Sequence, residues 1–187
     1  MAVTFLLTLI VLRWKLVTGG SGLFGKIDRL GDYSARNKMT SGTANAFICG
    51  DTPLKSGVHA WRVTVNGLDN NGGSIVLGIV QAGKNLSDES YNDYTLFAIE
   101  TVGTGLRRLG GIRTSDSGFA EFRSGDKLDF VLDVDHCVLT VITLKDGRRC
   151  SFNLPIPFFG WLPHFHLYYS GNEVSIELIT PARAGKQ

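Results

Sequence analysis

The sequence predicts an all-β protein, a bent sandwich of two stacked antiparallel sheets with few or no helices. From about residue 45 onward, apolar and polar residues alternate with a period of two over many short segments. Clusters of Gly, Asn, Asp and Pro separate these segments, and such clusters are typical of turns. No long helical segment interrupts the series. Short strands spaced by turns favour a sandwich over an α/β fold.

Length, charge and cysteine usage exclude several classes of protein. A chain of 187 residues is most simply one domain, with a net charge of only +2 and no dense Lys/Arg run. We therefore expect no nucleic-acid partner. The 3 cysteines are widely spaced without a C-x-x-C pair, which argues against a disulfide framework or a zinc site and fits a reducing compartment. We expect a cytoplasmic, monomeric module without metal or other cofactor.

The N-terminal segment is apolar over residues 2–12. This run is too short to span a bilayer as a helix. It has no basic residue before its apolar centre and no A-x-A-like cleavage site after it, so a signal peptide fits poorly. A β-strand or an apolar leader packed on the domain fits better, with a secretory or membrane-tethered role as the alternative. We divide the chain into residues 1–22, a sandwich over 23–182 and a tail over 183–187.

A glycine-rich stretch over Gly20–Lys26 matches G-x-G-x-x-G and G-x-x-x-x-G-K. Such loops bind phosphates at the N-terminus of a following helix. Residues 27–39 permit one helix, but Gly31 interrupts it and no parallel βαβ series follows. Ile27 also stands where a magnesium-binding Ser or Thr is needed. We interpret the stretch as a structural loop, and a nucleotide-binding enzyme remains the alternative.

The strands expected before the central hairpin differ in how much of each is apolar. Residues 58–65 alternate, as in a half-buried strand, whereas 74–80 are almost continuously apolar and indicate a strand covered on both faces. Shorter strands are expected over 46–49, 94–99 and, within a Gly/Thr/Ser/Arg-rich stretch, 106–112.

A central hairpin is predicted over Phe122–Leu144, with Asp135-His136 as its turn. Leu132 then faces Leu139 and Phe130 faces Val141, so that all four enter one core. Asp129 falls on the polar face. A strand over 148–154 follows, and a second hairpin pairs 165–170 with 173–179 around Gly171-Asn172.

Several of these pieces, in this order, resemble the SPRY domain family over roughly residues 35–180. They are Gly57–Val65, Ile75–Val80, Phe122 with Gly125-Asp126, Leu132–Asp135 with Leu139–Val141, and Pro163–Tyr168 with Glu173–Ile176. The resemblance implies a concanavalin-like bent sandwich that recognises other proteins, often as the substrate-selecting module of a ubiquitin-ligase or scaffold assembly. The chain departs from the family at Cys137, where a small residue is usual in the turn, and its PRY motif is not recognisable.

Candidate catalytic residues have structural interpretations. His164-x-His166 and Asp133-x-Asp135 each place two potential metal ligands on one strand face. In a core hairpin, however, Asp133 belongs to the polar face and Asp135 makes the turn. His59 shares a face with Trp61 and is expected to be a packed, hydrogen-bonded histidine. No local motif assembles a nucleophile with a base, so we expect no enzyme.

The resemblance also implies a binding site for a protein or short peptide. Tyr94 stands in the place of a family tyrosine, Tyr169-Ser170 in the place of a Trp-Gly pair, and Lys38 and Thr40 in the places of an Arg and a Pro. Tyr168 and Asn172, near the same hairpin tip, complete the predicted set. Which of the two adjacent tyrosines points outward is left open by the alternation.

Two further points remain open. Phe158, Phe159 and Trp161, which lie between prolines, form either an exposed recognition patch or a plug on the sandwich. A carbohydrate-binding, lectin-like sandwich is the third functional class, and it rests on the apolar N-terminus and on the likeness of the fold to lectins.

Overall fold

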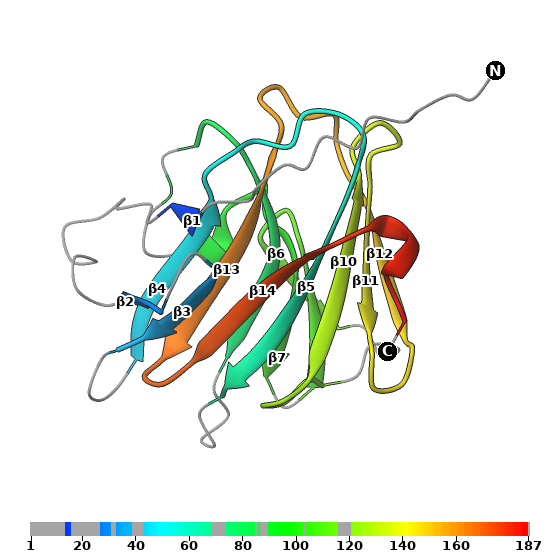
Figure 1. Cartoon of the computed structure of the whole chain (residues 1–187). Coiled ribbons are helices and arrows are strands. Elements are labelled where there is room, and N and C mark those ends of the chain that lie inside the picture. Colours follow the sequence, from blue (N-terminus) through cyan, green and yellow to red (C-terminus); the bar gives the residue numbers. More distant parts are fainter. Residues whose placement is uncertain are drawn as a thin grey trace.

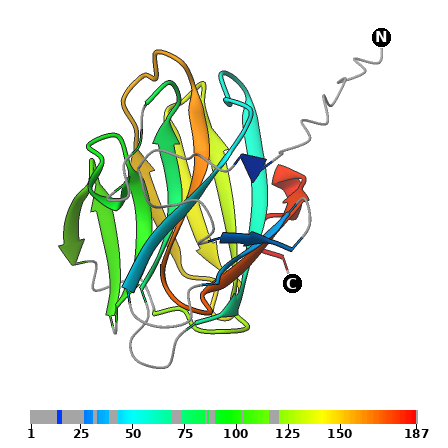
Figure 2. The ribbon, with the colours of Figure 1, turned by 90° about the vertical axis from the view of Figure 1, so that its left-hand side faces the viewer.

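The computed structural model describes residues 14–15, 27–30, 33–38, 43–68, 74–84, 86, 90–102, 104–115 and 121–186. Two seven-stranded antiparallel sheets stack face to face, which confirms the predicted sandwich (Figure 1, Figure 2). The first sheet has the order β1 (Trp14–Lys15), β4 (Thr43–Gly50), β13 (Trp161–Tyr169), β6 (Ile75–Gln81), β7 (Phe97–Val102), β8 (Thr104–Leu109) and β9 (Ile112–Ser115). The second has the order β12 (Arg149–Asn153), β11 (Val138–Thr143), β10 (Lys127–Asp133), β5 (Val58–Gly67), β14 (Glu173–Ile179), β3 (Ser34–Asn37) and β2 (Ile27–Arg29).

Helical structure in these ranges is limited to two short 3₁₀ turns, η1 (Ser90–Asn92) and η2 (Pro181–Arg183). Neither turn approaches the length and apolarity that a helix crossing a bilayer needs. The helix that the nucleotide-binding alternative needs after its loop does not form in the described residues, because β2 and β3 pair there as antiparallel strands.

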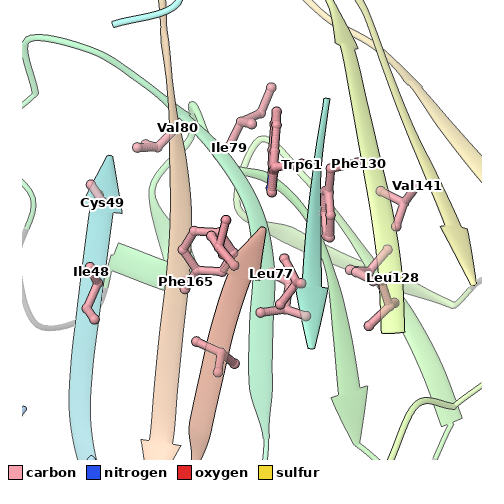
Figure 3. Close-up of a cluster of buried hydrophobic side chains, with 14 of the residues drawn as sticks. Ile48, Cys49, Trp61, Leu77, Ile79, Val80, Leu128, Phe130, Val141 and Phe165 are labelled. Atoms are coloured by element: carbon pink, nitrogen blue, oxygen red, sulfur yellow. The ribbon is translucent and has the colours of Figure 1, made fainter. Parts of the chain in front are cut away.

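The core lies between the sheets and is organised by the central hairpin. Its predicted register is confirmed, because Phe130 pairs with Val141 and Leu132 with Leu139. Trp61 of β5 stacks on Phe130 with ring centroids 5.5 Å apart, and Figure 3 shows both rings pointing toward β6. Both side chains are fully buried, which stabilises the fold by about 1.5–3 kcal/mol for each large apolar residue.

The hairpin turn spans residues 134–137, and Cys137 has a positive φ of 55°. Among the non-glycine residues that the structure describes, Cys137 alone has a positive φ. A side chain costs about 1–2 kcal/mol in this left-handed conformation, which glycine adopts without that cost.

The structure shifts two other predicted strands. Tyr94 lies in a turn before β7, because the Asp93 carboxylate accepts hydrogen bonds from the backbone N–H and the hydroxyl of Thr95. The short strands expected near 106–112 are β8 and β9, which extend beyond this range on both sides and are separated by the Gly110-Gly111 turn. Both glycines have positive φ, which this tight turn requires.

Each sheet is also partly covered on its outer face. As predicted, β6 is buried on both faces: Leu77 faces the sandwich core, whereas Val76 packs with Leu96 and Ala98 outside it. On the second sheet Asp129 lies on the face opposite the core, as predicted, but it is buried there, because Gly185 donates to it and Lys186 accepts from its partner Arg62. The interpretations of residues 2–12 and Gly20–Lys26 lie outside the described residues.

Candidate functional site

A cavity of about 280 Å³ lies on the outer face of the first sheet, next to η1. We call it the η1 cavity. Its walls come from five strands and from η1 itself. The lining residues are Ser74, Val76, Tyr91, Glu100, Arg108, Arg113, His166, Tyr168 and Tyr169.

Strand register explains why these residues meet. His166 of β13 pairs with Val76 of β6, which pairs in turn with Glu100 of β7. Successive strand residues point to opposite faces, so the core positions Phe165 and Leu167 leave His166 on the outer face. Val76 and His166, which are 90 places apart in the chain, are therefore neighbours on one surface.

Glu100 is the charged centre of the cavity floor and is only 2% exposed. Its Oε1 accepts hydrogen bonds from Ser74 Oγ at 2.8 Å and Arg113 Nη2 at 2.5 Å. Its Oε2 accepts from Arg108 Nε at 2.7 Å and Arg113 Nε at 3.2 Å. Burial by itself raises the pKa of Glu100, but the hydrogen bonds from Arg113 and Arg108 outweigh it and hold the pKa below its usual range.

Arg108 also holds η1 and the β8–β9 turn in place beside the cavity. Its Nη1 donates to the backbone carbonyls of Tyr91 and Gly111, at 2.9 and 3.2 Å. The guanidinium is buried, and its carbon lies 5.1 Å from the centroid of the Tyr91 ring. One side chain therefore joins the floor, the η1 wall and the β8–β9 turn.

A buried polar chain holds η1 from below. Ser90 Oγ lies 3.3 Å from Nε2 of His164 and 3.4 Å from Nδ1 of His166, and Cys49 Sγ lies 3.2 Å from Nδ1 of His164. Burial lowers the pKa of His164 to about 3 and lowers that of His166 well below 6.5, so both rings are neutral at pH 7.

Cys49 and His164, in this buried polar group, do not form a thiolate–imidazolium pair. Burial raises the pKa of the Cys49 thiol, so the thiol stays protonated beside the neutral His164 ring. A reactive cysteine requires a lowered thiol pKa. The chain therefore anchors η1 and supplies no nucleophile near neutral pH. In the described ranges, no group of three or more His, Cys, Asp or Glu side chains is arranged to hold a metal ion.

Aromatic rings form the rest of the wall. Tyr91 and Tyr168 meet edge to face with centroids 6.2 Å apart, and Tyr168 and Tyr169 likewise at 4.9 Å. The pairing of β13 with β4 shifts register between Leu167 and Tyr169. Such an irregularity changes the direction of a side chain, so that both tyrosines line the cavity. The question that alternation left open is thereby answered: both rings are half-buried on the outer face.

The other predicted residues of the hairpin differ in exposure. Ser170 is half-buried beside the tyrosines, and Lys38 is exposed after β3. Asn172 is fully buried, and its Nδ2 donates to the Ser74 carbonyl at 3.1 Å. Its side chain therefore holds the hairpin against β6. Thr40 lies outside the described residues.

Tyr94 does not line the cavity. It lies near the opposite end of β6, roughly 15–20 Å from Tyr168 by strand geometry. Its ring is 70% exposed, with the Lys84 ammonium 4.2 Å from the ring centroid. Phe158 and Phe159 are also exposed, and the Phe159 ring lies against Gly83, whereas Trp161 is fully buried in β13. The aromatic loop is thus exposed except for its tryptophan.

Sequence reasoning missed the charged half of the cavity, Glu100 with Arg108 and Arg113, and also Tyr91. One signal was present. Arg108 and Arg113 flank Gly110-Gly111, so a hairpin turn there places them directly opposite each other, as the structure shows. Like charges facing across a strand pair are destabilising, which indicates that a carboxylate lies nearby.

Comparison with known proteins supports the fold. No protein-family model matches the chain, and no curated protein does. Solved structures do match. The SPRY domain of human HERC1 superposes with a TM-score of 0.66 at 14% identity, over 83% of this chain and 96% of that domain. The TRIM65 PSpry domain gives 0.65 at 14% identity over 90% and 92%, and stonustoxin gives 0.66 at 14% over 90% of this chain and 28% of the toxin chain. The chain has the fold of SPRY domains, as the motifs predicted.

Proposed function

We propose that this domain is a non-catalytic module that binds a protein or an extended peptide over the η1 cavity. The observation that carries the proposal is the cavity itself, which has three tyrosine rings beside a fixed group of polar donors. Tyrosine is frequent at interaction hot spots, because it offers a large contact area and a polar tip while losing little conformational entropy. The SPRY-type fold supports a protein ligand in general.

Preorganisation supports the same proposal. Arg108 and Ser90 bind η1 to the sheet before any partner arrives, so little freedom is lost when a ligand docks. A cavity of about 280 Å³ suits one or two side chains rather than a whole cofactor. The remainder of the segment would lie across the half-buried Tyr168 and Tyr169 and over the adjacent hairpin tip.

We propose further that the domain acts as an adaptor. In that role the bound protein is presented to a ubiquitin-ligase or scaffold assembly. This form predicts that affinity capture retrieves ligase or scaffold subunits together with the partner, and that both are lost with the same variant.

The test compares wild type with Tyr168→Ala and Tyr94→Ala in quantitative affinity capture. Truncating a hot-spot tyrosine costs about 2 kcal/mol or more, so Tyr168→Ala should reduce partner recovery at least about tenfold. Tyr94→Ala, at the far end of β6, tests whether the partner extends that far. Equal recovery of the same proteins by wild type and Tyr168→Ala, both folded, would contradict the proposed site.

A further inference from the structure

We propose that the η1 cavity selects partners by binding the side-chain carboxylate of an Asp or Glu in the docked segment. The inference rests on the proposed function and adds its chemical specificity. It is supported by the net charge of the residues that line the cavity. Among the lining residues that the structure describes, Arg108 and Arg113 are cations and Glu100 is an anion, while His166 is neutral, so these residues together carry one positive charge.

No nearby carboxylate in the described ranges cancels this charge. Asp93 follows η1 in the chain, but its carboxylate accepts hydrogen bonds from Thr95 and acts electrostatically on His164. His166 does line the cavity, and its pKa is lowered by burial, His164 and Arg108. Asp93 is not among these causes. Glu100 already has four donors on its two oxygens. An unmatched guanidinium at a partly enclosed site favours an anionic ligand.

Arg113 is the cation that a ligand can reach. Its side chain is 50% exposed, whereas that of Arg108 is only 4% exposed. The hydrogen bonds to Glu100 use Nε and Nη2 of Arg113 and hold the plane of the group in place. A guanidinium has five donor hydrogens, so its Nη1 hydrogens can serve a ligand as well. Arginine held in this way is preorganised for a carboxylate.

The size of the charge excess favours a carboxylate over a phosphate monoester. One excess positive charge balances a single carboxylate. A phosphorylated side chain carries about −1.5 to −2 charges and would leave a net negative charge in the cavity. The Tyr168 and Tyr169 rings, beside the cation, would contact the residues that flank the acid.

The experiment begins with selection of random heptapeptides displayed on phage against the full chain. Affinities of the selected peptides are then measured by fluorescence anisotropy. We expect Asp or Glu at one fixed position. Replacing it with Asn or Gln should weaken binding to wild type about tenfold to a hundredfold, as for loss of a charge-assisted hydrogen bond. In Arg113→Gln the acidic and the amide peptide should bind equally.

A matched control is Arg148→Gln. Arg148 is 53% exposed and pairs with Asp146 in the β11–β12 turn of the second sheet, so its charge and exposure resemble those of Arg113. This variant should keep the preference for the acidic peptide. If Arg113→Gln does not fold, the comparison of acidic with amide peptide on wild type still decides the question.

Three outcomes are distinguishable. Selected peptides that lose binding with Tyr168→Ala but show no acidic preference would overturn this inference and leave the proposed function standing. Failure to enrich any peptide would contradict both. An acidic preference that persists in Arg113→Gln would also overturn the assignment of Arg113.

Discussion

Among the residues whose burial the structure describes, Glu100 on the first sheet and Asp129 on the second are buried carboxylates on the outer faces, and their surroundings differ. Asp129 on the second sheet is fully buried and accepts two hydrogen bonds from Arg62, at 2.7 and 3.0 Å. Its Oδ2 also accepts one from the Gly185 backbone N–H at 2.7 Å. Glu100 on the first sheet meets two arginines instead of one.

The two buried carboxylates differ in how completely the neighbouring arginines balance their charge. Arg62 and Asp129 form a matched pair, which raises the pKa of Arg62 mainly through their hydrogen bonds. Residues near the C-terminal end cover this pair, because the Lys186 carbonyl accepts from Arg62. Glu100 lies beside an open cavity whose described lining residues include one more cation than anions. The same residue types therefore close one face of the sandwich and line an open cavity on the other.

The largest effect should come from Asp129→Ala. Removing one partner of a buried ion pair leaves an uncompensated charge, which destabilises by about 3–5 kcal/mol. Urea denaturation would measure the loss. Glu177→Gln is the control, because this exposed residue interacts with Arg62 only electrostatically and should change stability by less than about 1 kcal/mol. A small effect of Asp129→Ala would mean that the pair does not hold the face closed.

Acid should weaken the first sheet before the second. Buried and neutral, His164 has a folded-state pKa of about 3, whereas the unfolded chain takes up the proton near pH 6.5. The unfolded state thus binds more protons between these values, so stability falls as the pH drops below about 6.5. The slope is about 1.4 kcal/mol per pH unit for each such histidine.

The check is urea denaturation at pH 7, 5.5 and 4.5, combined with hydrogen exchange along β13. Wild type should lose roughly 3 kcal/mol or more between the extremes. His164→Gln should show a shallower dependence. A stability that does not change down to pH 4.5 would contradict the neutral buried histidines.

The core was predictable because its information is local. The register of β10 with β11 follows from alternation around one turn, and Phe130 and Leu132 met the predicted partners. The burial of β6 on both faces also followed from its continuous apolar run. In each case the residues that decide the structure lie within a short stretch of chain.

The η1 cavity was only half predictable. Tyr168 and Tyr169 were found because aromatic side chains at a hairpin tip are conspicuous. Glu100, Arg108 and Arg113 lie in a stretch that resembles a polar loop, and only the antiparallel pairing of β7, β8 and β9 makes them one cluster. The burial of Asp129 was missed for a similar reason, because its cover comes from residues 56 places later.

Ser90→Ala should loosen η1, which lies beside the Glu100 cavity. It should leave residues 185 and 186, which cover Asp129, unchanged. It leaves nitrogen atoms of His164 and His166 without the hydroxyl that lies between them, at a cost of about 1–3 kcal/mol. Hydrogen exchange should speed up over residues 90–96 and stay unchanged over 183–186. Equal protection of 90–96 in both proteins would show that Arg108 alone holds η1.

The smallest effect on stability should come from Arg113→Gln. Arg113 is half exposed, and Glu100 keeps Arg108 and Ser74, so the loss should be less than about 1 kcal/mol. Arg62→Gln should cost more, because it leaves the buried Asp129 without its only ion-pair partner in the described ranges. Thermal unfolding of the two variants side by side measures this contrast. Equal losses would erase the distinction between the two faces.

The most direct test of the account is hydrogen exchange by mass spectrometry on the domain with a selected peptide bound. The account predicts slower exchange in residues 90–92, 112–115 and 168–171, which surround the η1 cavity. It predicts no change near Gly125–Lys127 and Leu144–Lys145, where a second cavity of about 290 Å³ lies beside Arg62. Protection confined to that second cavity, or to Tyr94 and Phe158, would contradict the account.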